Sequence, residues 1–290
     1  MSRRFCLAAL TVWALTAATV WAEPPLKALI VDGQNNHNWR ETTPILQSQL
    51  EETGLFAVDV ATSPPRGEDM SGFQPDFAAY DVVVLNYTDI GGGDRWPEPT
   101  ERALEAYVAG GGGLVSYHAA ASAFPDWEEY NTMIGLGGWG GRTQRHGPYV
   151  YWEDGRIVHD DSPGPTGTHG PQHAFPIVVR RGDHPITRGL PERFMHRADE
   201  LFAHFRGRAK NMTVLATAYS APEQRGSGRH EPMLLTVEYG EGRVFTTMLG
   251  HGVPQLASPA FQVTFQRGTE WAATGKVTQP VPDDLPVAED

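Results

Sequence analysis

The sequence has almost no cysteine: Cys6 is the only one among 290 residues, and it lies in an apolar stretch near the N-terminus. The rest of the chain can therefore form no disulfide and offers no thiol nucleophile or thiolate metal ligand. Basic residues are also few, with 23 lysines and arginines against 35 acidic residues and a net charge of −12. Because such a chain repels a phosphate backbone, we expect no nucleic-acid partner.

The N-terminus has the three-part pattern of a secretory signal peptide. Arg3 and Arg4 precede the apolar stretch 5–20, and residues 20–22 form a cleavage site that ends in a small residue. We therefore expect residues 1–22 to be removed and the protein to be exported, periplasmic or extracellular, with no stable membrane insertion. The alternative is a retained anchor, since the apolar run is nearly long enough to span a bilayer.

Strand and helix patterns alternate over the first 120 residues. The first run, residues 26–32, is apolar almost throughout, as in a parallel strand buried on both faces. The expected strands are 26–32, 56–62, 80–87 and 113–118, and the expected helices are 43–53 and 99–109. This order predicts an α/β fold with a mostly parallel central sheet flanked by helices.

The second half of the chain is less regular. After a short helix to residue 134, the segment 135–170 is rich in Gly, Pro and His and has little periodicity, which is typical of a functional lid or insertion. Further strands are expected at 174–180, 213–218, 233–239 and 243–249, the last two as a hairpin, with a closing helix at 259–274. We expect a single domain over 23–275 and a loose tail over 276–290.

Polar side chains follow several of the predicted strands, which is where ligands bind in an open parallel sheet. The residues at these positions are Asp32, His37, Trp39, Asn86, His118 and His251. Because the carboxyl ends of parallel strands meet at one edge, we expect these residues to converge on a single polar rim.

His118 occupies the strand-to-helix turn where hydrolases and amidotransferases of similar topology carry a nucleophile. The local sequence, Ser116-Tyr117-His118-Ala119-Ala120, has neither a cysteine nor the G-x-S-x-G elbow, which disfavours acyl-enzyme chemistry. His118 is therefore either an acid-base or ligand group, or a histidine hydrogen-bonded at a strand end for structural reasons.

A metal site is one interpretation of the 11 histidines. His37, His118 and His251 would bind a divalent ion such as zinc, and an oxygen of Asp32 or Glu200 would complete the site. The chain has no H-E-x-x-H motif, so the ligands would come from distant segments. The alternative is that these histidines act as acid-base groups without a metal.

Other polar and aromatic residues have two interpretations each. Glu200, next to Asp199, is a candidate base or ligand, with His204 on the same face if the segment is helical, but the acidic pair could also be a solvated surface pair. His184 lies in a turn fixed by a proline and is interpreted as structural. Tryptophans that could stack on a sugar or belong to the core are Trp39, Trp127, Trp139 and Trp152.

Several short motifs, taken in order, resemble the ThuA-like, or trehalose-utilisation, family. They are His37-Asn38-Trp39, 112–118, 184–190, Asp199-Glu200-Leu201-Phe202, 239–245 and Leu249-Gly250-His251. The resemblance implies a flavodoxin-like, class I glutamine amidotransferase-like sheet without the amidotransferase cysteine. It also implies an association with the breakdown of disaccharides and 3-keto sugars.

Our preferred hypothesis is an exported carbohydrate-processing enzyme of hydrolase or lyase type, acting on a glycoside or an oxidised (3-keto) sugar by acid-base or metal-assisted cleavage. Its catalytic residues would be His118, His251 and Glu200, and its substrate-binding residues His37, Trp39, Asn86 and Asp32. The alternative is a non-catalytic glycan-binding or scaffolding module on the same fold. Self-association into a homo-oligomer is left open.

Overall fold

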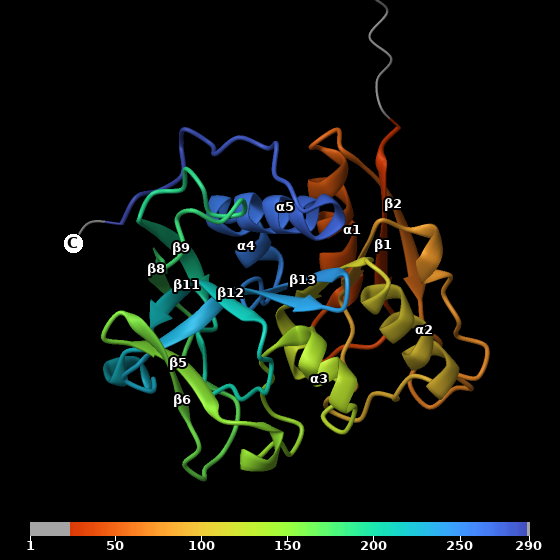
Figure 1. Ribbon diagram of the computed structural model, residues 1–290, viewed down its shortest axis with the longest axis horizontal. Helices are drawn as coiled ribbons and strands as arrows, with labels where there is room; N and C mark the ends of the chain where they lie inside the picture. Colours follow the sequence, from red (N-terminus) through yellow and green to blue (C-terminus); the bar gives the residue numbers. More distant parts are fainter. Residues whose placement is uncertain (1–23, 289–290) are drawn as a thin grey trace, which may run out of the picture.

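A large β-sheet lies at the centre of the computed structural model, which describes residues 24–288 (Figure 1). Five parallel strands lie in the order β2-β1-β3-β4-β13, with bounds β1 Leu26–Asp32, β2 Phe56–Thr62, β3 Val82–Leu85, β4 Gly113–Tyr117 and β13 Gly242–Thr247. This order is that of a flavodoxin-like sheet. The predicted α/β fold with a parallel central sheet is therefore confirmed, whereas the predicted signal peptide, 1–22, lies outside the described residues.

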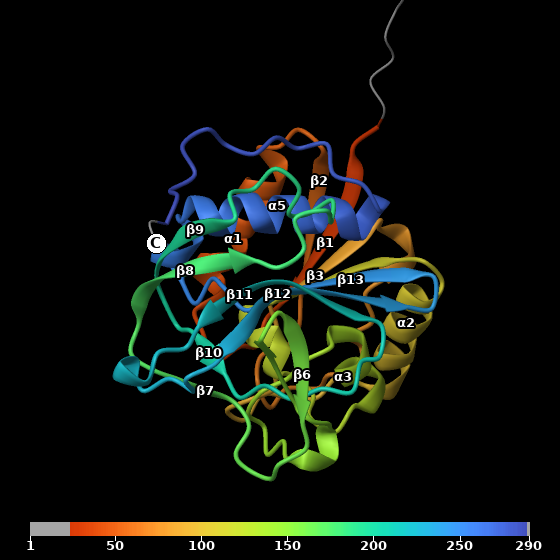
Figure 2. The same ribbon diagram turned by 60° about the vertical axis from the view of Figure 1, so that its left-hand side comes forward.

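Antiparallel strands extend the sheet beyond β13, in the order β12-β11-β8-β9 (Figure 2). Their bounds are β8 His173–Val179, β9 Arg193–Asp199, β11 Met212–Tyr219 and β12 His230–Tyr239. The hairpin of β5 Tyr149–Glu153 and β6 Arg156–Asp160 pairs with β12. A separate two-stranded ladder joins β7 Thr168–His169 to β10 Phe202–Ala203.

This extension corrects two expectations. The segment 135–170, expected to have no elements of its own, contains β5, β6 and β7. The segment from Asp199 to His204 is not helical, because it ends β9 and forms β10. The backbone of His204 has a φ of +59°, so its side chain does not share a helical face with Glu200.

Helices cover both faces of the sheet. Their bounds are α1 Trp39–Glu51, α2 Glu98–Ala109, α3 Glu128–Ile134, α4 Val253–Leu256 and α5 Pro259–Thr274, with 3₁₀ turns at Phe77–Ala79, His118–Ser122, Gln144–His146 and Pro222–Gln224. In Figure 1, α1 and α5 lie together on one side of the sheet, and α2 and α3 lie on the other. Within residues 24–288, no helix is long and apolar enough to cross a membrane.

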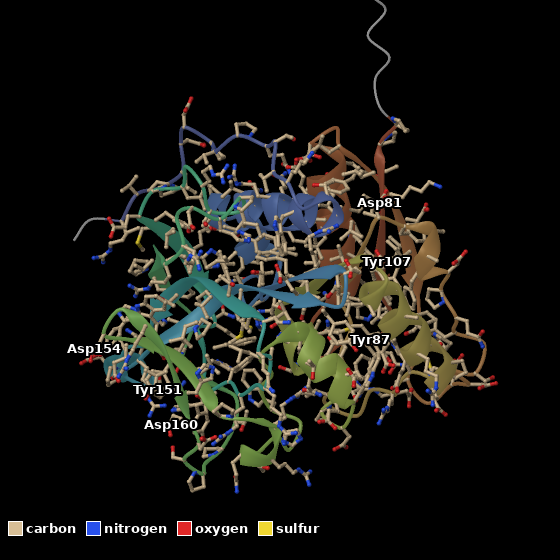
Figure 3. The ribbon with its side chains drawn as sticks, viewed as in Figure 1. Asp81, Tyr87, Tyr107, Tyr151, Asp154 and Asp160 are labelled. Carbon is tan, nitrogen blue, oxygen red and sulfur yellow. The ribbon has the colours of Figure 1, made fainter. Side chains whose placement is uncertain are left out.

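The core follows from the apolar strands. All residues of β3 and β4 are buried, because helices cover the sheet on both faces. The hydroxyl of Tyr107 on α2 donates to the carbonyl oxygen of Gly113 at 3.1 Å, which fastens the helix to the start of β4 (Figure 3). Tyr151 and Asp160 lie on the β5–β6 hairpin (Figure 3). Arg229, the residue before β12, pairs with Asp160 at 3.3 Å and lies over the ring of Tyr151.

Residues 276–288 are packed against the molecule, which differs from the expected loose tail. The Glu270 carboxylate accepts a hydrogen bond from the main-chain N–H of Thr278 at 2.5 Å, and Arg267 donates to the Gln279 carbonyl oxygen at 2.5 Å. Further along, the N–H of Met195 donates to the Pro286 carbonyl oxygen at 2.7 Å. The segment therefore covers the edge of β9, which would otherwise expose unpaired backbone groups.

Candidate metal and substrate site

Four titratable side chains from separate segments meet beyond the carboxyl ends of the parallel strands. They are His37, His118, Glu200 and His251, and one possible ligand atom from each lies within 4.8 Å of the others. His37 follows β1, His118 follows β4 and His251 follows β13. Glu200 comes from the antiparallel part, between β9 and β10. The expected convergence of the three histidines is therefore present, and Glu200 joins them.

His118 is fixed by a strained turn and by one hydrogen bond. Its φ is +43°, in the left-handed region that few residues other than glycine adopt. Its Nδ1 lies 2.8 Å from the carbonyl oxygen of Met248. Because a carbonyl only accepts, Nδ1 carries the hydrogen and Nε2 presents its lone pair to the cluster. This Nε2 is buried and has no hydrogen-bond partner among residues 24–288.

His37 is oriented by the loop that follows β1. Its main-chain N–H donates to the side-chain oxygen of Asn35 at 2.9 Å, and its Nδ1 lies 3.2 Å from the same oxygen. The Asn35 amide in turn donates to the side-chain oxygen of Asn86 at 3.1 Å. The His37 ring packs edge-on against His118 and His251, with centroids 4.9 and 4.5 Å away. Because Nδ1 faces Asn35, Nε2 of His37 is the ring nitrogen that is available to the cluster.

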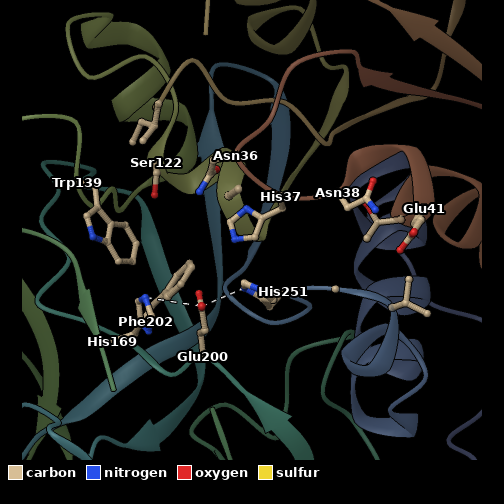
Figure 4. Close-up of a pocket in the computed structure, with 15 residues that line it drawn as sticks. Asn36, His37, Asn38, Glu41, Ser122, Trp139, His169, Glu200, Phe202 and His251 are labelled. Atoms are coloured by element: carbon tan, nitrogen blue, oxygen red, sulfur yellow. Dashed lines mark ion pairs between the residues drawn. The ribbon is translucent and has the colours of Figure 1, made fainter. Parts of the chain in front are cut away.

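Glu200 lies between the histidines, as Figure 4 shows for His169 and His251. Its Oε1 is 3.1 Å from Nδ1 of His251 and 3.7 Å from Nε2 of His169, and its Oε2 is 3.9 Å from Nε2 of His118. The close contact with His251 is an ion pair without hydrogen-bond alignment, because that buried Nδ1 has no hydrogen-bond partner among the described residues. The carboxylate is thus shared by several imidazoles.

The environment sets the charge of these groups. Burial, together with the neighbouring imidazoles, lowers the pKa of His37 to about 3, and burial also lowers the pKa of His118. The Glu200 carboxylate raises the pKa of His251. Burial alone would raise the pKa of Glu200, but the histidines, His251 first, hold it below its usual value. At neutral pH the cluster therefore contains an ionised carboxylate beside neutral imidazoles at His37 and His118.

A cavity of about 500 Å³ opens in front of the cluster (Figure 4). Its lining is Asn36, His37, Asn38, Glu41, Thr42, Ile90, Ala119, Ser122, Trp139, His169, Glu200, Phe202, His251, Gly252 and Val253. One wall is aromatic, where Trp139 packs edge-on against Phe202 with centroids 4.8 Å apart. An aromatic wall facing polar groups is the composition expected of a small-molecule site.

Three residues predicted to bind substrate do not line this cavity. Asp32 is buried and accepts a hydrogen bond from the hydroxyl of Thr62 at 2.7 Å. Asn86 is buried and donates to the hydroxyl of Thr42 at 3.0 Å, so it shapes the loop that carries His37. Trp39 is the first residue of α1 and is absent from the lining. Asp32 ends β1 and Asn86 follows β3, as predicted, but their side chains bond to Thr62 on β2 and Thr42 on α1.

Other residues were not predicted as part of the site. His169, Phe202 and Ser122 line the cavity, and Trp139 was singled out only as one of four tryptophans. His169 pairs with Phe202 across β7 and β10. The only sequence signal for His169 is its place in the Gly- and His-rich segment 135–170, which also contains Trp139.

Two interpretations of single residues have clear outcomes. Asp199 is fully buried and bonded to His196 at 2.8 Å, so the acidic pair is not a solvated surface pair. His184 packs against Trp271 with centroids 5.0 Å apart and does not line the cavity, which fits its structural interpretation.

Comparisons with known proteins agree with this architecture. The family model ThuA, described as trehalose utilisation, matches residues 27–272. A putative ThuA-like protein from Parabacteroides merdae is 49% identical, with 91% of this chain and 95% of that chain covered and a TM-score of 0.87. One from Bacteroides uniformis is 18% identical and shares the fold, with 91% and 97% covered and a TM-score of 0.60. Among curated proteins, none matches this chain.

The prediction of a periplasmic or extracellular location is contradicted. A protein of this fold from Salmonella typhimurium is described as cytoplasmic; it is 16% identical, with 85% of this chain and 99% of that chain covered and a TM-score of 0.50. The prediction came from residues 1–22 alone, and these lie outside the described residues. The fold that follows them is not tied to export, so we do not retain that location.

Proposed function

The chain belongs to the ThuA, or trehalose-utilisation, family, and from this premise we propose that it is a carbohydrate-processing enzyme whose site holds a divalent metal ion. The proposed ion is zinc or a similar cation, with His37, His118, His251 and Glu200 as ligands. The proposed substrate is a glycoside or an oxidised (3-keto) sugar bound in the cavity beside Trp139.

The observation that carries this proposal is the meeting of three imidazoles and one carboxylate, in which two imidazole nitrogens make no hydrogen bond to any described residue. His118 Nε2 and His251 Nδ1 are both buried without a hydrogen-bond partner among the described residues. Leaving a buried polar atom unsatisfied costs about 1–3 kcal/mol, and a cation between them would satisfy both. Imidazole nitrogens with a carboxylate oxygen form a donor set that suits zinc. When bound, such an ion supplies Lewis-acid polarisation of a substrate carbonyl or hydroxyl oxygen.

The chain's own residues would bind the sugar and move one proton. His169 Nδ1 lies 2.8 Å from the carbonyl oxygen of Gly170, so Nδ1 carries the hydrogen and Nε2 is free to accept one. Its side chain is 38% exposed and faces the cavity beside Glu200, outside the set of four ligands. We propose His169 as the base and Trp139 as the stacking wall.

A 3-keto sugar offers a reaction that needs no covalent nucleophile. The carbonyl at C3 acidifies the hydrogen on C2, so His169 takes this proton and the released electron pair forms a C1–C2 double bond. The bond between C1 and the glycosidic oxygen breaks at the same time, and the leaving oxygen takes a proton from solvent. Deprotonation of His169 by solvent then restores the base. No thiol or serine nucleophile is required, in keeping with the sequence around His118.

The metal centre is tested by zinc titration of the purified protein by calorimetry. We expect one zinc per chain in the wild type, and a loss of affinity in His118→Ala and His251→Ala beyond the 10–100-fold that is typical for an outer-shell partner. His159→Ala is the matched control, because His159 is exposed on β6 and lies outside the cluster. Equal zinc affinity in all four proteins would refute the ligand assignment.

The reaction is tested with nitrophenyl 3-keto-glucoside and nitrophenyl glucoside in the presence of zinc. We expect the wild type to release nitrophenol from the 3-keto-glucoside but not from the glucoside, which lacks the carbonyl at C3. We expect no release from either by the His118→Ala/His251→Ala double variant. Full activity in the double variant would overturn the proposal. Tight sugar binding without release, unaffected by the histidine substitutions, would favour the glycan-binding module instead.

A further inference from the structure

Asp199 is a buried carboxylate directly behind the proposed metal ligands. It has no exposed surface and does not line the cavity. Its oxygens accept hydrogen bonds from the main-chain N–H groups of Glu200 at 2.8 Å, Gly250 at 2.7 Å and His251 at 3.3 Å. A further bond comes from Nε2 of His196 at 2.8 Å. These donors use all the acceptor sites that a carboxylate has, about four.

Two of these donors belong to proposed ligands from different parts of the sheet. Glu200 follows the antiparallel β9, whereas His251 follows the parallel β13. We infer that Asp199 is the positioning residue of the metal centre, which fixes the main chain at Glu200 and at His251 so that their side chains meet. This inference rests on the proposed function, because it assigns a role within the same centre.

The surroundings of Asp199 leave this arrangement little freedom. Gly250 has a φ of +102°, and a Cβ there would lie 2.7 Å from the rings of Phe261 and Tyr117. The backbone before His251 is therefore confined on one side by aromatic rings and on the other by the Asp199 carboxylate.

His196 supports the carboxylate from behind. Because a carboxylate only accepts, Nε2 of His196 carries the hydrogen that it donates to Asp199. Nδ1 of His196 lies 3.0 Å from the hydroxyl of Ser258, the residue before α5. The carboxylate is thereby linked to the start of a helix that packs on the sheet, and outer-shell groups of this kind tune ligand position and metal affinity.

The test is zinc affinity of Asp199→Asn, measured by calorimetry and corrected for the folded fraction. Asparagine keeps the shape, but its NH₂ group must face main-chain N–H groups that need an acceptor. We expect zinc affinity to fall 10–100-fold and the absorption spectrum of the cobalt-substituted protein to change. Thr264→Val is the control, since it removes another buried hydrogen bond, to the Ala260 carbonyl oxygen in α5, and should leave both readouts unchanged.

The outcomes separate this inference from the metal proposal. A purely structural role predicts lower stability of Asp199→Asn with unchanged zinc affinity of the folded protein, and that result would overturn the inference. If the wild type binds no zinc, the metal proposal fails. In that case, and also if Asp199→Asn does not fold, amide hydrogen exchange of the wild type tests the role of Asp199. Slow exchange at Gly250 and His251 supports the part of the inference in which Asp199 fixes the main chain there, and exchange at the rate of an open loop refutes it.

Discussion

Substitution of Glu231 by glutamine should change how the stability of the protein depends on pH. Glu231 lies in β12, is only 2% exposed, and accepts a hydrogen bond from the hydroxyl of Ser227 at 2.6 Å. Burial raises its pKa from 4.5 to about 7. A carboxyl whose pKa is higher in the folded state keeps a proton that the unfolded chain has already lost. The free energy of unfolding therefore falls as the pH rises from about 4.5 to about 7.

The size of this effect follows from the shift itself. The difference of about 2.5 pKa units, at 1.36 kcal/mol per unit, corresponds to about 3 kcal/mol of stability that is present below pH 4.5 and lost by about pH 7. Glutamine cannot ionise, so Glu231→Gln should lack this loss. Its stability relative to the wild type should rise across the window by about 3 kcal/mol.

Urea unfolding of both proteins at several pH values measures this difference. Subtracting the two curves removes the contributions of all other titrating groups, provided that they are unchanged by the substitution. A difference that is independent of pH would refute the assignment of a buried, protonated Glu231. A difference that grows in favour of the wild type as the pH rises would refute the sign.

Three further substitutions test the walls of the site. Arg142→Met removes a buried guanidinium that donates to the main-chain oxygens of Ser122 and Gly138, so we expect a loss of more than about 3 kcal/mol in urea unfolding; an equally stable variant would contradict this. Trp139→Ala should weaken sugar binding at least about fivefold in calorimetry, for a contact of about 1 kcal/mol, while zinc affinity stays unchanged. His169→Gln should keep zinc but lose about 10²-fold or more in turnover of the 3-keto substrate, and an unchanged rate would exclude it as the base.

Three histidines of the site, His37, His118 and His251, could be predicted from the sequence because each of them follows a recognisable strand. The runs before His118 and His251 are apolar and end in glycine or aromatic residues, and parallel strands bring their carboxyl ends to one edge. His37 follows the first strand by a few residues. The convergence of these three histidines could therefore be predicted without knowing the order of the strands in the sheet.

The sequence identified Glu200 as a candidate site residue, but it did not predict where this residue lies relative to the histidines. Its position depends on β9, whose sequence Arg193–Asp199 mixes charged and apolar residues and has no clear alternation. This strand is at the sheet edge and gains its cover from residues 276–288, which are distant in sequence. Tertiary contacts, rather than local pattern, therefore decide where this carboxylate lies.

The direction of each side chain was the second feature of the site that the sequence could not predict. Asp32 and Asn86 stand at the predicted edge, yet their polar groups bond to Thr62 and Thr42 and not to the cavity. A position after a strand gives the edge of the sheet, whereas the local backbone angles decide which way the side chain points. The cavity wall at Trp139 depends on the same kind of detail, since its φ is +49°.

The turn after β4 links these findings to chemistry. Sheet enzymes that attack a carbonyl use a strained strand-to-helix turn to expose a nucleophile. Here the same turn is strained, with a φ of +43°, but it presents the imidazole of His118, whose Nδ1 is engaged by the Met248 carbonyl oxygen. An imidazole held in that way offers a single lone pair, at Nε2, in a fixed direction. A fixed lone pair within 4.8 Å of possible ligand atoms of Glu200 and two further histidines is more useful for holding a cation than for attacking a substrate. The strain of this turn therefore supports a ligand role for His118.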